Sequence, residues 1–226
     1  MSLQSLIFNS APFAVVPAMM MAMLLFRSSN ITLRILSIHI LISAITEFSS
    51  TLLWSMKINN IFLLHIYTLE EFALLSWFYA TIITGKAWKT FFQASVIVFS
   101  ILTLLNSIFL QTLSVNNTYA RGLESLICMV YAIICFNRLI NSSSSSMSRH
   151  YYLGLLLINS GVLIYFTSSS LLFTLSNYLR KPELTDARML VWTFHAFFSI
   201  VYYLLLFFGL WIIRRSKSYS YYLQAH

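Results

Sequence analysis

Seven long apolar runs, joined by short polar connectors, constrain the fold of this chain more than any other feature. Each run has roughly the 20 mostly apolar residues that a helix needs to cross the hydrocarbon core of a bilayer. Unbroken runs of this length do not fit a membrane barrel, whose strands alternate apolar and polar residues. The sequence therefore predicts an all-α bundle of about seven transmembrane helices. The runs lie at residues 7–26, 33–55, 61–84, 90–113, 121–140, 151–176 and 189–213.

The composition supports the same fold class. Hydrophobic residues make up 59% of the chain and charged residues only 9%, whereas a soluble globular chain carries about 25% charged residues. The 226 residues leave room for one membrane domain, 1–213, followed by a short basic and aromatic tail, 214–226. The net charge of +8 is explained by Lys and Arg at the ends of spans, so we expect no nucleic-acid partner.

Basic residues are distributed unevenly between the two sides of the predicted bundle. The side that carries the C-terminal tail has nine of the 14 basic residues, and the other side has five. Because Lys and Arg favour the cytoplasmic side, the N-terminus is predicted outside and the tail inside. The first basic residue, Arg27, follows the first run, so we expect that run to be a span and not a cleavable signal. The expected location is the inner (plasma) membrane, crossed several times.

Four of the six carboxylates lie within the predicted spans, namely Glu47, Glu70, Glu71 and Glu124. A charged residue near a helix centre costs about 2.5–3.5 kcal/mol on insertion scales, so such residues normally face the bundle interior and have partners. The predicted orientation puts Glu47, Glu70 and Glu71 in the outer half of the membrane, at the depth of His195. Glu124 is interpreted differently, because Arg121 lies beside it near a span end and the two predict an ion pair at the interface.

Helical phase, at 100° per residue, gathers polar groups on particular faces of the spans. In the third span Tyr67, Glu70 and Glu71 share a face, and His65 points well away from it. In the seventh span a second polar stripe passes through His195. Stripes that face one another predict a polar pocket that opens outward. Its candidate ligand-binding residues are Glu47, Tyr67, Glu70, Glu71, His195, Trp192, Ser199 and, with its membership open, His65.

The segment LHIYTLEEFALLSWFY, residues 64–79, also carries a resemblance to other proteins. Together with Glu47 upstream and the RGLES sequence, Arg121–Ser125, at the start of a later span, it resembles small bacterial seven-helix membrane proteins. The resemblance covers about the second to the fifth span. It implies the same seven-helix architecture and brings no activity with it.

Such a pocket fits three functions. The first is binding of a polar or cationic small molecule, with the signal passed to a partner protein because no catalytic domain is attached. The second is an intramembrane hydrolase of a lipid-like substrate, in which His65, His195 and one carboxylate could hold zinc, although no HExxH motif is present. The third is proton-coupled transport, because two adjacent carboxylates in a low-dielectric medium disfavour double ionisation.

Ligand sensing without a cofactor is the leading expectation. A retinal protein needs a lysine within a span, and none of the predicted spans contains one. The expected partners are the bilayer, an unknown small molecule, and either a signalling protein or a second copy of the chain. The five lysines lie in connectors or in the tail, at Lys57, Lys86, Lys89, Lys181 and Lys217.

Overall fold

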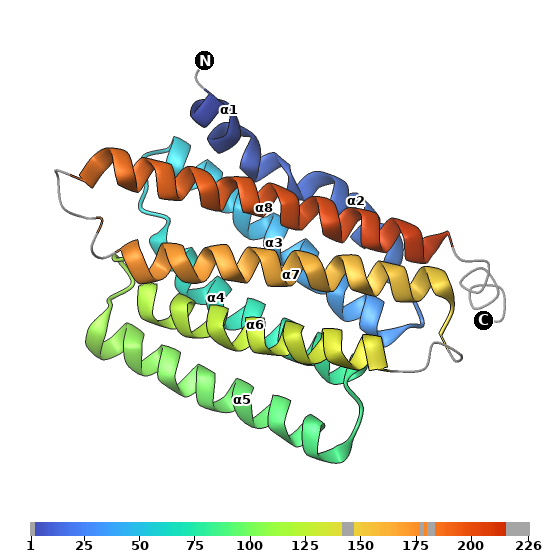
Figure 1. Cartoon of the computed structure of the whole chain (residues 1–226). Helices are drawn as coiled ribbons and strands as arrows, with labels where there is room; N and C mark the ends of the chain where they lie inside the picture. The colour runs from blue at the N-terminus through green and yellow to red at the C-terminus, as the bar shows by residue number, and fades with distance from the viewer. Residues whose placement is uncertain (1–2, 142–146, 177–178, 180–183, 216–226) are drawn as a thin grey trace.

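The computed structural model describes residues 3–141, 147–176, 179 and 184–215. Within these ranges every regular element is a helix and no strand is present, which confirms the predicted all-α class (Figure 1). The elements are α1 (Leu3–Ser10), η1 (Ala11–Phe13), α2 (Val15–Leu25), α3 (Ile31–Ser55), α4 (Ile61–Ile82), α5 (Lys86–Leu105), the π-helix η2 (Asn106–Leu110), α6 (Thr118–Asn141), α7 (Arg149–Ser176) and α8 (Thr185–Arg214).

Seven helical segments of the described chain are long and apolar enough to cross a membrane. Their limits agree with the apolar runs to within a few residues at each end, so the chain has the features of a multi-pass membrane protein. The segments are Leu3–Leu25, Ile31–Ser55, Ile61–Ile82, Lys86–Leu110, Thr118–Asn141, Arg149–Leu175 and Thr185–Arg214. Most of the predicted tail, residues 216–226, lies outside the described residues.

The first of these segments is broken, which the hydropathy of the sequence does not show. It consists of α1, a 3-10 turn and α2, and Pro12 lies in the 3-10 turn. A proline inside a helix lacks the amide proton of the regular hydrogen bond and clashes with the preceding turn. Pro17 is tolerated, because it is the third residue of α2 and its missing N–H would have had no partner within the helix.

The helices that hold the core form a closed ring. Each neighbouring pair packs together in the order α2, α3, α4, α6, α7, α8, and α8 returns to α2. The remaining long helix, α5, packs mainly on α4 and barely touches α6, and it lies at the edge of the bundle in Figure 1. Side chains from α3, α4, α6, α7 and α8 therefore meet inside the ring.

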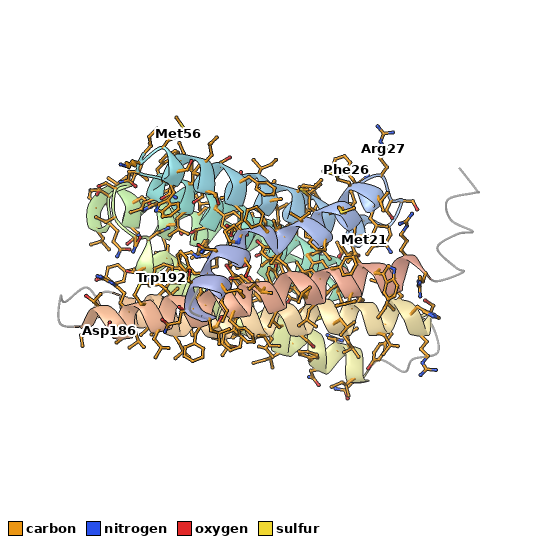
Figure 2. All side chains as sticks on the ribbon, turned by 90° about the horizontal axis from the view of Figure 1, so that it is seen from above. Met21, Phe26, Arg27, Met56, Asp186 and Trp192 are labelled. Atoms are coloured by element: carbon orange, nitrogen blue, oxygen red, sulfur yellow. The ribbon has the colours of Figure 1, made fainter. Side chains whose placement is uncertain are left out.

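Seen from above, the side-chain view shows which segments share an end of the bundle (Figure 2). Met56, which follows α3, lies at the same end as Asp186 and Trp192 of α8, and Phe26 and Arg27 lie at the opposite end. We call the first the Met56 end and the second the Arg27 end. The Met56 end is the one that the distribution of basic residues predicts to face outward.

Candidate functional site

Arg121, in the first turn of α6, is the centre of a buried ionic network. Its side chain is only 2% exposed. Nη1 donates hydrogen bonds to Glu71 on α4 and, at 2.8 Å, to Oε2 of Glu124 one turn further along α6. Nη2 donates to the hydroxyl of Tyr165 on α7 at 3.0 Å. One guanidinium therefore joins three helices.

Hydrogen bonds extend this network from Glu71 to α3. Tyr67 lies one turn before Glu71 on α4, and its hydroxyl donates to Oε1 of that carboxylate at 2.9 Å. The same hydroxyl lies 2.9 Å from Oγ of Ser43 on α3. A continuous line of polar contacts thus runs from α3 through α4 and α6 to α7, and we call it the Arg121 network.

Aromatic rings enclose the guanidinium. Its central carbon lies 5.8 Å from the ring centre of Tyr67 and 5.2 Å from that of Phe173 on α7. Both distances are within the ~6 Å range in which a cation is attracted to the face of an aromatic ring. The rings also exclude water, and the low dielectric strengthens each charged contact inside the network.

The network holds more negative than positive groups. Glu71 and Glu124 are both fully buried, and they share the single guanidinium of Arg121. With all groups ionised the network carries one uncompensated negative charge, which is costly in a membrane interior. Two of its polar atoms, Glu124 Oε1 and Arg121 Nε, are buried and have no hydrogen-bond partner among the described residues. The network therefore combines an excess of negative charge with unused hydrogen-bonding capacity.

A second pair of polar side chains connects α8, another helix of the ring, to this region. Nε2 of His39 on α3 lies 2.8 Å from the hydroxyl of Tyr202 on α8. The Tyr202 ring stacks on Tyr165, with ring centres 4.7 Å apart and an angle of 18° between the planes. Because Tyr165 also accepts from Arg121, α8 contacts the network through a stacked tyrosine pair.

Of the predicted ligand-binding residues, Tyr67 and Glu71 lie in the Arg121 network itself. Glu47 and Glu70 are half-buried, and neither carboxylate has a hydrogen bond or ion pair to another described residue. Glu47 is close enough to Glu71 and Arg121 to interact with their charges. The structure therefore places Glu47 beside the network and gives Glu70 no contact with it.

The predicted residues of α8 line the aromatic side of the network. His195 is half-buried and packs near Tyr165 and Phe173, at ring-centre distances of 5.5 and 6.1 Å. Trp192 contacts the same imidazole edge-on at 6.2 Å, and Ser199 donates to the backbone carbonyl of His195 at 3.0 Å. Nδ1 of His195 is buried without a partner in the described part of the chain.

His65 faces the other way, as helical phase predicts. Its Nε2 donates to the backbone carbonyl of Val115 at 3.0 Å, because a carbonyl can only accept. Its other ring nitrogen, Nδ1, lies 2.9 Å from the hydroxyl of Ser107. His65 thus holds η2 and the following connector against α4, and it makes no contact with the carboxylates of the network.

The ion pair predicted between Arg121 and Glu124 is confirmed. Its side chains are only 2% and 0% exposed, so the pair is buried among the helices. The connector before α6 is also buried: Gln111 and Asn117 in that connector are 6% and 0% exposed. The sequence contained one signal for this ion pair: Arg121 lies three residues before Glu124, in the same half of the predicted membrane as Glu71.

A metal centre gains no support from the geometry. In the described ranges, no three His, Cys, Asp or Glu side chains lie together in a way that could hold a metal ion. Comparison with known proteins finds no matching family model, no similar curated protein and no similar solved structure. The functional argument therefore rests on the Arg121 network.

Proposed function

We propose that the protein is a ligand-binding sensor of the plasma membrane, and that the Arg121 network is the part of the bundle that responds to the ligand. The observation that carries the proposal is the pairing of two fully buried carboxylates with a single guanidinium. Uncompensated charges are rare inside membrane proteins, and those that occur usually have a function. A ligand that supplies the missing positive charge binds more favourably than a neutral one.

The unpartnered atoms define the chemistry of this ligand. Glu124 Oε1 needs a donor and Arg121 Nε needs an acceptor. A small organic cation with both N–H and O–H groups, such as a protonated amino alcohol, meets both needs. Glu47, half-buried beside the network, offers a second carboxylate to the same cation. With the N-terminus outside, this ligand arrives from the outer side of the membrane.

The network also offers a route for the signal. Its contacts join α3, α4, α6 and α7, and the stacked tyrosines bring in α8. A change of charge at Glu124 alters hydrogen bonds that hold all these helices in register. A partner protein, or a second copy of the chain, would read the resulting shift.

Ligand-dependent stability in lipid nanodiscs tests the proposal. Ethanolamine, a protonated amino alcohol, is compared with ethylene glycol, its neutral analogue of similar size. Ethanolamine at 100 times its dissociation constant should stabilise the protein by about 2.7 kcal/mol, and ethylene glycol should not. Glu124→Gln removes the excess charge, so it should abolish the response to ethanolamine. Asp186→Asn, which neutralises an exposed carboxylate of α8, is the matched control and should respond like the wild type.

Two results of the same experiment would contradict the proposal. Equal stabilisation by ethanolamine in the wild type and in Glu124→Gln would remove the network from the binding site. No response to any of a set of protonated amines would contradict a sensor of organic cations. Glu47→Gln then decides whether the half-buried carboxylate takes part, because its loss should weaken binding without abolishing it.

Proton-coupled transport is the second candidate, and one observation favours it. The carboxylates differ in burial, from the half-buried Glu47 to the fully buried Glu71 and Glu124. Graded burial of this kind suits a proton relay. Proteoliposomes that contain a pH-sensitive dye test it. Glu47→Gln should abolish the proton uptake that the dye reports, and unchanged proton uptake in this variant would exclude the function.

A further inference from the structure

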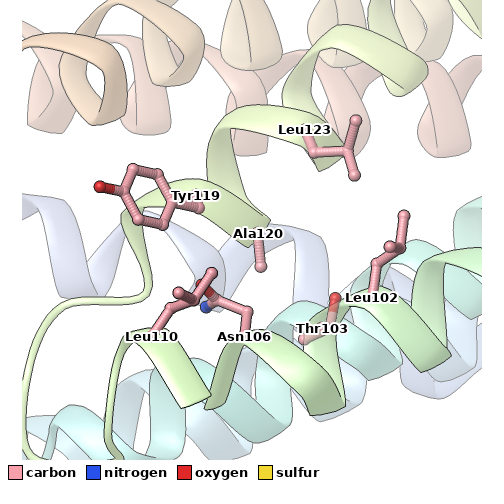
Figure 3. Close-up of a pocket in the computed structure, with 7 residues that line it drawn as sticks. All are labelled: Leu102, Thr103, Asn106, Leu110, Tyr119, Ala120 and Leu123. Carbon is pink, nitrogen blue, oxygen red and sulfur yellow. The ribbon is translucent and has the colours of Figure 1, made fainter. Parts of the chain in front are cut away.

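A second site lies apart from the Arg121 network, in a cavity between α5 and α6. The cavity has a volume of about 190 Å³. Figure 3 shows α5 and η2 forming one wall and the start of α6 forming the other. Its lining residues are Leu102, Thr103, Asn106, Leu110, Tyr119, Ala120 and Leu123. Because α5 barely touches α6, the gap is not closed by helix packing.

The cavity has an apolar rim and a polar floor. Leu110 and Tyr119 at the rim are 70% and 59% exposed, on a surface that faces lipid in a membrane-spanning bundle. Thr103 and Asn106 are only 2% and 5% exposed. Thr103 Oγ1 and Asn106 Oδ1 are buried and have no hydrogen-bond partner among the described residues. Unpartnered polar atoms on the floor of an open cavity are available to a ligand.

Neighbouring hydrogen bonds fix which atom of the Asn106 amide is left free. The backbone N–H of Tyr119 donates to Gln111 Oε1 at 3.1 Å, so that oxygen is an acceptor. Asn106 must therefore present its Nδ2 to Gln111 Oε1, at 3.3 Å, and the same nitrogen donates to Asn117 Oδ1 at 2.8 Å. Its carbonyl oxygen remains as an acceptor without a donor.

The backbone at this point is also unusual. Asn106 begins the π-helix η2, in which the N–H of Gln111 bonds to the carbonyl of Asn106 at 2.7 Å. Single π-turns of this kind are rare and are frequently found at functional sites. The wider turn belongs to the segment that forms the floor of the cavity.

We propose that this cavity binds an uncharged, single-chain membrane lipid through its hydroxyl group. The hydroxyl donates to Asn106 Oδ1 and accepts from the hydroxyl of Thr103, and the alkyl chain lies between Leu102, Leu110 and Leu123. A fatty-acid anion has no proton to donate to Asn106, and a methyl ether has none either. The volume is below the ~300–1,000 Å³ of pockets that hold a bulky ligand, which also favours a slender chain. A helix from another protein is too wide to reach polar atoms this deeply buried.

Photolabelling in nanodiscs tests the proposal, which does not depend on the function of the Arg121 network. The probe is a long-chain alcohol with a diazirine in its chain, and its methyl ether is the matched control. The alcohol should label Leu102, Leu110 and Leu123, located by mass spectrometry, and should label them about fivefold more than the ether does, as expected for one hydrogen bond. Equal labelling by the two probes would overturn recognition of the hydroxyl.

Two variants and a control make the test specific. Thr103→Val keeps the shape of the side chain and should reduce labelling by the alcohol to near the level of the ether. Ala120→Leu fills the cavity and should abolish labelling by both probes. Thr90→Val, at an exposed threonine on the same helix, should leave labelling unchanged. If neither probe labels the cavity and a Leu110→Cys variant cross-links into dimers, a second copy of the chain occupies the groove and the proposal is wrong.

Discussion

Two polar clusters inside the same bundle differ in how completely their groups are paired. Toward the Arg27 end, the hydroxyl of Tyr79 donates to Asn159 Oδ1 at 2.8 Å, and Asn159 Nδ2 donates to the carbonyl of Ala132 at 2.9 Å. Tyr131 packs edge-on against Tyr79 and shares a 2.5 Å contact with Ser95 Oγ. We call this the Tyr79 cluster. It contains no charge, and the hydroxyls of Tyr79 and Tyr131 and the amide of Asn159 have partners. The nearby Ser76 Oγ is the atom of this region that is buried without a hydrogen-bond partner among the described residues.

The Arg121 network, toward the Met56 end, is charged and incomplete. Its two carboxylates exceed its one guanidinium, and Glu124 Oε1 and Arg121 Nε have no partner among the described residues. Neutral, fully paired groups are sufficient to hold helices together in a membrane. The comparison teaches that the Tyr79 cluster needs no function beyond packing, whereas the Arg121 network has charge and bonding capacity that packing does not require.

Removing the guanidinium should have the largest effect. Arg121→Met leaves two buried carboxylates without a counter-charge, so we expect the free energy of unfolding to fall by about 3–5 kcal/mol. Unfolding in mixed micelles measures it. The triple variant Arg121→Met, Glu71→Gln, Glu124→Gln removes all three charges and should recover most of the loss. If Arg121→Met alone lowers the free energy of unfolding by less than about 1 kcal/mol, the charge of Arg121 does not balance the two carboxylates of the network.

Close packing distinguishes the two ends of the bundle as well. An added Cβ at Gly154 of α7 would lie 2.7 Å from the backbone carbonyl of Gly209 on α8, and at Gly122, next to Arg121, it would meet nothing within 4 Å. Gly154→Ala should therefore cost about 1–3 kcal/mol through overpacking. Gly122→Ala should be neutral or stabilise by up to about 1 kcal/mol, because alanine favours a helix. If thermal unfolding shows equal losses of stability in the two variants, the two ends of the bundle are packed equally closely.

Single hydroxyl deletions compare the clusters directly. Tyr79→Phe removes the bond to Asn159, and Tyr67→Phe removes the bond to Glu71. Each should lower the free energy of unfolding by about 0.6 kcal/mol and at most about 1.7 kcal/mol, the average and the maximum for side-chain hydrogen bonds in a membrane bundle. Tyr67→Phe also removes the contact with Ser43 on α3. Only Tyr67→Phe should change the response to ethanolamine, because it alone alters a carboxylate of the network. A changed response in Tyr79→Phe would remove the distinction between the clusters.

The spans could be predicted from the sequence because the length and hydropathy of a run decide whether it crosses a bilayer. Phase on a single helix was also informative: Tyr67 and Glu71 share a face, and His65 points elsewhere. The order of helices around the ring was not predictable, because it depends on which apolar faces fit together. For the same reason, no pattern in the sequence identified Tyr165 as a partner of Arg121.

The burial of Arg121 shows why exposure is harder to predict than span number. The expected span began at 121, whereas α6 begins at Thr118, so Arg121 lies within the first turn of the helix. The preceding connector then folds inward, where Asn117 hydrogen-bonds to Asn106 and Gln111 to Thr118. These mutual hydrogen bonds allow polar residues next to the span end to be buried.

The smallest expected effect concerns Glu70, the neighbour of Glu71 in the chain. Its half-buried carboxylate has no partner among the described residues, so Glu70→Gln should change the free energy of unfolding by no more than about 0.5 kcal/mol. Asp186→Asn provides the baseline for a fully exposed carboxylate. If Glu70→Gln alone changes the free energy of unfolding, measured by thermal unfolding, by more than about 1 kcal/mol, this carboxylate contributes to the charge of the network. The network would then hold three carboxylates around one guanidinium, an excess of two negative charges, with a correspondingly greater need for a cation.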